Sequence, residues 1–302
     1  MIFQIILQNH KNFLVFGIMY EFFVNGFNIW FKFYILIKRV EVKKMKNMKK
    51  INGKLFIIAI VSFFVLMLPT NISADPTNPE IGVSWIVNYD YWDDLPYCDD
   101  DAEALRDDLI DDPSTGWIEG FTTSNSNVHD EQWEIYDDED YVDDVHFAYY
   151  AGHGWVSPYT GRAVLVFDSN IFKTPIDSAD IYFRDLCDWG DENNQKLNWV
   201  GLACCEVGQK TQYALEGVHI ICGWTTYCAD KVYGEELAEQ LMDGETVKDA
   251  WFNTGETLGD EDTTMRVIAE DISVANDHLY GYGTVYSDPT VDSTYYAWTQ
   301  TV

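Results

Sequence analysis

Two adjacent cysteines and one histidine have the side-chain types and the setting for covalent chemistry. Cys204 and Cys205 follow the apolar run of residues 197–203, and His153 stands between two glycines after the apolar run of residues 145–151. A thiol becomes a strong nucleophile when it loses its proton, and a nearby imidazole can accept that proton. If the two run ends meet in space, the sequence predicts a Cys–His pair that can attack a carbonyl group.

Either cysteine could be the nucleophile. Cys204 directly follows an alanine, whereas Cys205 lies one residue closer to the turn that leaves the strand, and we favour Cys205 for that reason. The alternative is that both are buried small hydrophobic residues. The N–H of Gly154, together with the N–H of the cysteine, could form an oxyanion hole.

The elements that must position these residues follow from the apolar pattern. Near-continuous apolar runs predict strands, and runs with helical spacing between them predict helices, so we expect an α/β domain with a mainly parallel sheet. In such sheets, functional groups gather beyond the carboxyl ends of the strands. The expected strands are residues 81–89, 145–151, 163–167, 197–203 and 219–223, with further ones at 265–268 and 283–286, and the expected helices start near 99 and cover 207–216, 233–242 and 246–258.

An apolar strand followed by His-Gly, and later an apolar strand followed by Ala-Cys, resembles the caspase-like cysteine peptidases, clan CD, which include caspases, legumains, gingipains and clostripain. The stretches VDDVHFAYYAGHGW (residues 142–155) and LNWVGLACCEVG (residues 197–208) carry the resemblance. It extends over most of residues 81–288 and is nearest to poorly characterised exported prokaryotic members. The resemblance implies a three-layer α/β/α sandwich and a thiol protease, a hydrolase acting on polypeptides through a Cys–His dyad.

The resemblance also implies part of a substrate cleft at Trp224, Thr225 and Thr226, which follow the expected strand of residues 219–223. A core position for Trp224 is the alternative. From a different functional class, a catalytically inactive binding or cell-surface module on the same fold is the second hypothesis.

The charge of the chain excludes one class of partner. The chain has 19 Lys and Arg against 50 Asp and Glu; residues 1–74 hold 10 and 2 of these, so the remainder carries 9 and 48, a net charge of −39. We therefore expect no nucleic-acid partner, because phosphate binding depends on Lys and Arg. The acidic segments 90–101 and 137–144 could bind Ca²⁺ but lack EF-hand spacing, and we expect no required cofactor or metal.

The N-terminal region predicts export. Residues 45–74 combine a basic start, a 14-residue apolar run and a small residue at the expected cut after Ala74, as in a signal peptide. A retained N-terminal anchor is the alternative. Residues 1–44 are either not natively translated or contain a membrane helix over residues 13–37. We therefore expect a secreted or cell-surface protein whose single domain, residues 75–302, is not membrane-inserted. Export permits disulfides, and Cys222 with Cys228 is a candidate pair.

Overall fold

The computed structural model describes residues 2–10, 13–24, 27–38, 76, 78–90, 92–134, 138–167, 180–182, 187–190, 196–291 and 294–302. The chain divides into two units, Met1–Thr70 and Asn71–Val302. The first unit contains an antiparallel sheet of β1 (Ile2–His10), β2 (Phe13–Val24) and β3 (Phe27–Lys38), whereas one of the two alternatives from the sequence was a membrane helix over residues 13–37. Within the described part of the chain, no helix is long and apolar enough to cross a membrane. The expected signal peptide lies outside the described residues.

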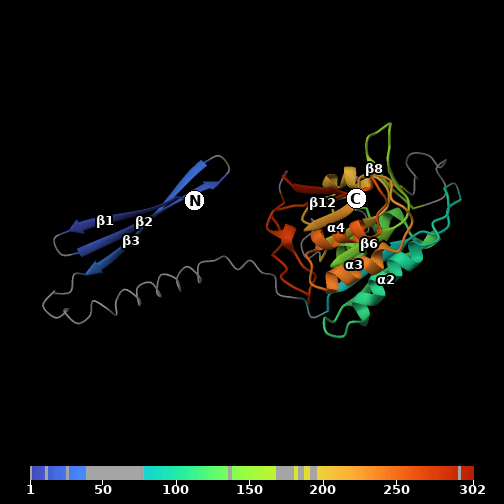
Figure 1. Ribbon diagram of the computed structural model, residues 1–302, viewed down its shortest axis with the longest axis horizontal. Coiled ribbons are helices and arrows are strands. Elements are labelled where there is room, and N and C mark those ends of the chain that lie inside the picture. The colour runs from blue at the N-terminus through green and yellow to red at the C-terminus, as the bar shows by residue number, and fades with distance from the viewer. Residues whose placement is uncertain are drawn as a thin grey trace. The chain divides into compact units, whose positions relative to one another are not determined.

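The second unit is built on a seven-stranded sheet in the order β13-β12-β11-β10-β6-β4-β5 (Figure 1). The five strands from β5 to β11 run parallel, and β12 and β13 join antiparallel at one side. The expected α/β class with a mainly parallel sheet is therefore confirmed. The strands are β4 (Glu80–Trp85), β5 (Ile118–Ser124), β6 (Phe147–Ala151), β10 (Trp199–Ala203), β11 (Ile220–Trp224), β12 (Thr264–Ala269) and β13 (Tyr296–Thr301).

Strand alternation divides the core into two layers. Along β6, Phe147, Tyr149 and Ala151 face one hydrophobic cluster, while Ala148 and Tyr150 face the other. The first cluster also takes in the apolar faces of α2 (Cys98–Asp111), α3 (Tyr233–Met242) and α4 (Val247–Leu258). Figure 1 shows these helices side by side. The central strand β6 is thus buried on both faces.

The second face differs from the expected sandwich. A small antiparallel sheet of β7 (Gly154–Val156), β8 (Ala163–Val166) and β9 (Asp180–Tyr182) contributes Ala163 to Val166 to the second cluster. The run at 163–167 is therefore a strand, but it belongs to this small sheet. In the described residues, the second layer consists of β-structure and 3₁₀ turns, so helices on both faces of the sheet are not observed.

Two predicted elements do not form, and one observed strand was not predicted. Residues 207–216 form two 3₁₀ turns, η6 (Val207–Gln209) and η7 (Thr211–Tyr213), in place of an α-helix. Gly208 packs so closely against β11 that a Cβ there would lie 2.9 Å from the Trp224 carbonyl oxygen, and this packing holds the segment in its tighter form. Residues 283–286 form no strand, and the C-terminal strand β13 was not predicted because its side chains are largely exposed.

Candidate active site

The two motif ends lie next to each other at the carboxyl edge of the sheet. Strands β6 and β10 are parallel neighbours, and Ala151 pairs with Ala203 at their last position. His153 and Cys205 each lie two residues beyond that pair. The N–H of Gly152 donates to the carbonyl of Ala203 at 3.3 Å, which keeps the two chains together past the strand ends. The expectation that the histidine and the cysteines come from adjacent strand ends is confirmed.

The two cysteines face opposite sides of the sheet. Cys204 is 1% exposed and belongs to the second cluster, with Leu202 on the same face. Burial raises the pKa of its thiol well above the ordinary range, so Cys204 remains a neutral packing residue. Cys205 is only partly buried and lines a cavity on the other side. Alternation along the end of β10 therefore selects Cys205 as the accessible thiol.

A third cysteine, which the sequence pattern did not indicate, contacts Cys205. The sulfur atoms of Cys205 and Cys228 lie 3.7 Å apart, and the Cys228 N–H donates to the Cys205 sulfur at 3.3 Å. All six cysteines are free thiols, and Cys222 is buried in the first cluster on β11. The expected pairing of Cys222 with Cys228 is therefore wrong, because Cys222 points into the core while Cys228 lies in the loop after β11.

This contact changes the acidity of Cys205. The side chain of Cys228 donates a hydrogen bond that stabilises the thiolate, and this effect together with the Cys228 N–H outweighs burial and the nearby Glu206 carboxylate. The pKa of Cys205 is lowered to about 7. The pKa of Cys228 is raised well above its usual value, first because its S–H is held by Cys205. At neutral pH about half of Cys205 is therefore thiolate, while Cys228 keeps its proton.

His153 is held in a defined orientation. Its ring lies 4.6 Å from the ring of Tyr89 and 5.1 Å from that of Trp92, measured between centroids. The backbone N–H of His153 donates to the Tyr89 hydroxyl at 2.9 Å. The imidazole Nε2 lies 2.8 Å from the backbone carbonyl oxygen of Asp93. A carbonyl can only accept, so Nε2 carries the hydrogen and Nδ1 carries the lone pair in the neutral ring.

Burial lowers the pKa of His153 below its ordinary value, and the hydrogen bond to the Asp93 carbonyl only partly opposes this. The ring is therefore neutral at pH 7, the protonation state of a general base.

Gly154 lies directly against the cysteine turn. A Cβ on Gly154 would lie 2.7 Å from Cγ1 of Val207 and 3.0 Å from the carbonyl oxygen of Cys205, so a larger residue does not fit. In the β7–β8 ladder, the carbonyl of His153 and the N–H of Ser157 form hydrogen bonds to the neighbouring strand. The N–H of Val156 instead donates to Oε2 of Glu206. The alternation of an antiparallel ladder directs the Gly154 N–H to the same side as that of Val156, toward the cysteine turn.

The turn after Cys205 is strained. Glu206 has φ of 62°, in the left-handed region that non-glycine residues avoid. Its N–H donates to the carbonyl of Thr226 at 3.0 Å, and the N–H of Val207 donates to the carbonyl of Cys205 at 2.7 Å. These bonds fix the sharp exit from β10 that leaves the Cys205 thiol at the cavity.

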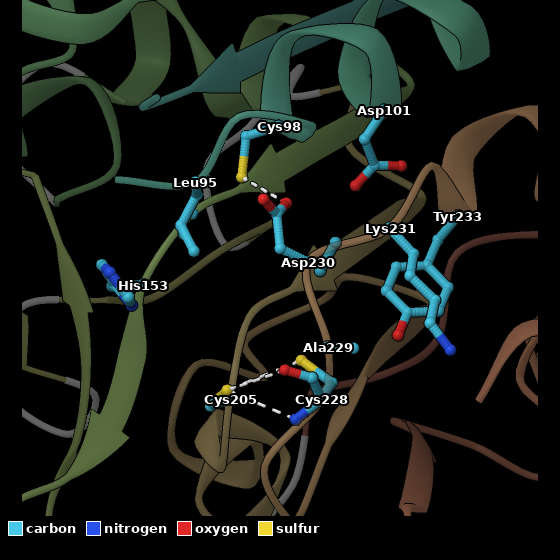
Figure 2. Close-up of a pocket in the computed structure, with 12 residues that line it drawn as sticks. Leu95, Cys98, Asp101, His153, Cys205, Cys228, Ala229, Asp230, Lys231 and Tyr233 are labelled. Carbon is cyan, nitrogen blue, oxygen red and sulfur yellow. Dashed lines mark hydrogen bonds between the residues drawn. The ribbon is translucent and has the colours of Figure 1, made fainter. Parts of the chain in front are cut away.

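His153 and Cys205 line one cavity of about 80 Å³. Figure 2 shows them on two sides of it, with Asp230 between Cys98 and the Cys205–Cys228 pair. The Asp230 carboxylate accepts from the N–H of Tyr97 at 3.1 Å and from the Cys98 thiol at 3.7 Å, at the start of α2. Lys231 directs its ammonium group to the Leu258 carbonyl and the Asp260 carboxylate, each at 2.6 Å. The cavity therefore has an acidic wall.

The expected cleft residues are placed differently. Trp224 is 1% exposed and packs against Tyr233 and Trp251 in the first cluster, so it is a core residue. Thr225 and Thr226 are partly exposed, but they hold β12, through the Thr264 carbonyl and N–H respectively. None of the three lines the cavity. Side chains alternate along β11, so Trp224 lies on the same face as Cys222, which is the face that the helices cover.

Sequence reasoning missed Cys228, Asp230 and the Asp93 carbonyl. The one usable signal was the position of Cys228 and Asp230 in the loop beyond β11, the next strand end along the sheet. Among the described residues, no group of three or more His, Cys, Asp or Glu side chains is arranged to hold a metal ion, so the structure offers no support for a Ca²⁺ site there.

Comparison with known proteins gives the family but no activity. No curated protein matches the chain. Residues 83–301, from within β4 to the end of β13, match the profile of the family described as "Domain of unknown function (DUF6345)", and the matched range contains His153, Cys205 and Cys228. This range is well over half of the chain, and the protein therefore belongs to the DUF6345 family.

Proposed function

We propose that the protein is a caspase-like cysteine endopeptidase, with Cys205 as nucleophile and His153 as general base and acid. One observation carries the proposal: a thiol whose pKa is lowered to about 7 and a neutral, oriented imidazole line one cavity from adjacent parallel strand ends. A lowered thiol pKa beside a base is a feature of catalytic cysteines and is not needed for packing.

The proposed reaction uses Cys205 and His153, which line this cavity, and the N–H of Gly154, which does not line it but lies against the cysteine turn. The Cys205 thiolate attacks the carbonyl carbon of a peptide bond, and the tetrahedral oxyanion accepts the N–H of Gly154. Nδ1 of His153 takes up the proton that Cys205 releases when its thiolate forms, and it passes this proton to the departing amine, which leaves the acyl group on the Cys205 sulfur as a thioester. Water, deprotonated by the same nitrogen, then hydrolyses the thioester and restores the thiol. The hydrogen bond from Nε2 to the Asp93 carbonyl stabilises the protonated ring during these steps.

The sheet supports the caspase-like interpretation as well. The histidine and the cysteine follow two central parallel strands, and antiparallel strands extend the sheet beyond β11. We also propose, from the signal-peptide pattern, that the protein acts on polypeptides outside the cytoplasm or at the cell surface. The acidic wall at Asp230 favours a positively charged side chain next to the cleaved bond.

A second candidate is a catalytically inactive binding module on the same fold. The cavity volume of about 80 Å³ weighs against catalysis in this cavity, because small-molecule sites commonly enclose roughly 300–1,000 Å³. In addition, the Cys205 sulfur is already in contact with Cys228. An active peptidase would have to widen this cavity when a substrate binds.

Active-site labelling distinguishes the two candidates. The reduced full chain is treated at neutral pH with a limiting amount of iodoacetamide, and peptidase activity is assayed on a peptide library. We expect alkylation of one native thiol, Cys205, with loss of activity, and we expect His153→Ala to lose peptidase activity because it lacks the general base. Cys204→Ala is the matched control and should label like the natural protein. Peptidase activity that persists in Cys205→Ala would refute the proposal, and labelling without any hydrolysis would support the inactive module.

A further inference from the structure

We propose that Cys205 and Cys228 form a reversible disulfide that closes the cavity and blocks the reactive thiol. The two sulfur atoms already lie 3.7 Å apart, and a disulfide bond measures about 2.05 Å. An approach of roughly 1.6 Å is therefore sufficient. The disulfide itself does not depend on the peptidase activity; its role as a switch rests on the proposed function.

The structure provides the means for this approach. Cys228 lies in the connection between β11, which ends at Trp224, and α3, which begins at Tyr233. Tyr227, its neighbour, is 78% exposed, and Cys228 is only partly buried at the edge of the first cluster, so little packing opposes a small displacement of this segment. Cys205 stands on the strained turn after β10, whose backbone is fixed by hydrogen bonds. The loop therefore moves toward the turn, and loop displacements of this size are common in folded proteins.

Competing thiols are less well placed. Cys204 points to the opposite face of the sheet, and Cys222 is buried on β11. Cys98 lines the same cavity, but its thiol donates to the Asp230 carboxylate. Cys228 is the cysteine whose sulfur and N–H both contact Cys205. The arrangement thus selects one pair out of six thiols.

The oxidation requires a small-molecule disulfide as the oxidant. The Cys205 thiolate attacks one sulfur of that disulfide, forms a mixed disulfide and releases one thiolate. Cys228 loses its proton to solvent and attacks the Cys205 sulfur, which forms the internal disulfide and releases the second thiolate. Two protein thiols are oxidised and one external disulfide is reduced to two thiols. A dithiol reductant reverses both steps.

The disulfide is tested by mapping the cross-link in the full chain. The reduced protein is incubated with oxidised glutathione, free thiols are blocked with N-ethylmaleimide, and the unreduced protein is digested with trypsin and chymotrypsin. Cleavage after Lys210, Trp224 and Tyr227 separates Cys222 from Cys228. We expect a cross-linked peptide pair that contains Cys228 and is two hydrogens lighter than the sum of its reduced parts.

Variants assign the partners and give the result that would overturn the proposal. The cross-link should persist in Cys204→Ala, which identifies Cys205, and in Cys98→Ser, the matched control from the same cavity. It should vanish in Cys228→Ser. No cross-link in the natural protein, or one that runs to Cys98 or Cys222, would overturn the disulfide.

The switch has a separate readout. If the reduced protein hydrolyses peptides, activity should fall in proportion to the cross-linked fraction and return with dithiothreitol. Cys228→Ser should instead keep glutathione on Cys205 as a mixed disulfide, detected as added mass in place of the internal cross-link. A mapped disulfide in a protein without hydrolysis would leave the disulfide standing and remove the proposed function. Full activity in the cross-linked protein would overturn the switch.

Discussion

Replacement of Cys228 by alanine should make Cys205 a weaker acid. The Cys228 side chain is the strongest influence that lowers the pKa of Cys205, and alanine removes its S–H donor. The Cys228 N–H, 3.3 Å from the Cys205 sulfur, remains. Burial and the Glu206 carboxylate then oppose the thiolate with less compensation. Burial is a larger influence than the remaining hydrogen bond from the Cys228 N–H, so we expect a pKa above that of an ordinary thiol.

The size of the effect follows from the thiolate fraction. With a pKa of about 7, about half of Cys205 is thiolate at pH 7. An ordinary thiol with a pKa of about 8.5 is only about 3% thiolate at that pH. The alanine variant should therefore react with iodoacetamide more slowly at pH 7, by at least about fifteenfold, and should approach the natural rate at high pH, where both thiols are ionised.

The assay is the rate of alkylation of Cys205 across pH 5 to 10, with the modified residue identified by mass spectrometry. The natural protein should show its inflection near pH 7, and Cys228→Ala a higher one. Cys228→Ser keeps a hydroxyl donor and should lie between them. An unchanged inflection in Cys228→Ala would refute the reasoning, as would an equal shift in Cys98→Ser.

Three further predictions follow from single contacts. Gly154→Ala places a methyl group 2.7 Å from Val207 Cγ1 and should lower the unfolding free energy by about 1–3 kcal/mol in denaturant titrations; an unchanged value would contradict the packing. His219 donates to Asp277 at 2.6 Å; burial opposes its protonation, but the carboxylate hydrogen bonds raise its pKa overall, so this stabilisation is complete below about pH 6.5 and is lost as pH rises through the raised pKa. Asp277→Asn should therefore cost about 3–5 kcal/mol at pH 5 and less at pH 8, and equal losses would refute it. In the proposed peptidase, Asp230→Asn should reduce the preference for Arg over Gln beside the cleaved bond about tenfold in kcat/KM, and an unchanged ratio would exclude this carboxylate from selectivity.

Predictions from local pattern succeeded where the burial of a segment follows the period of its secondary structure. The apolar runs that became β6, β10 and β11 are buried along their whole length, so nothing in them competes with the strand. The helix over residues 233–242 was placed at its observed bounds because its apolar spacing matches one buried face. The segment at 207–216 failed, because contact between Gly208 and β11 overrides its helical pattern.

By itself, the sequence determined the α/β class, the central parallel strands, and the presence of a histidine and a thiol at two strand ends, because these depend on local periodicity and on the geometry common to parallel sheets. Only the tertiary structure decided that the accessible thiol is Cys205, that its partner is Cys228, and that Trp224 lies in the core. Each of these depends on which face of the sheet a side chain meets and on which distant loop lies beside it. Contacts between residues far apart in the chain leave no periodic signal in the sequence.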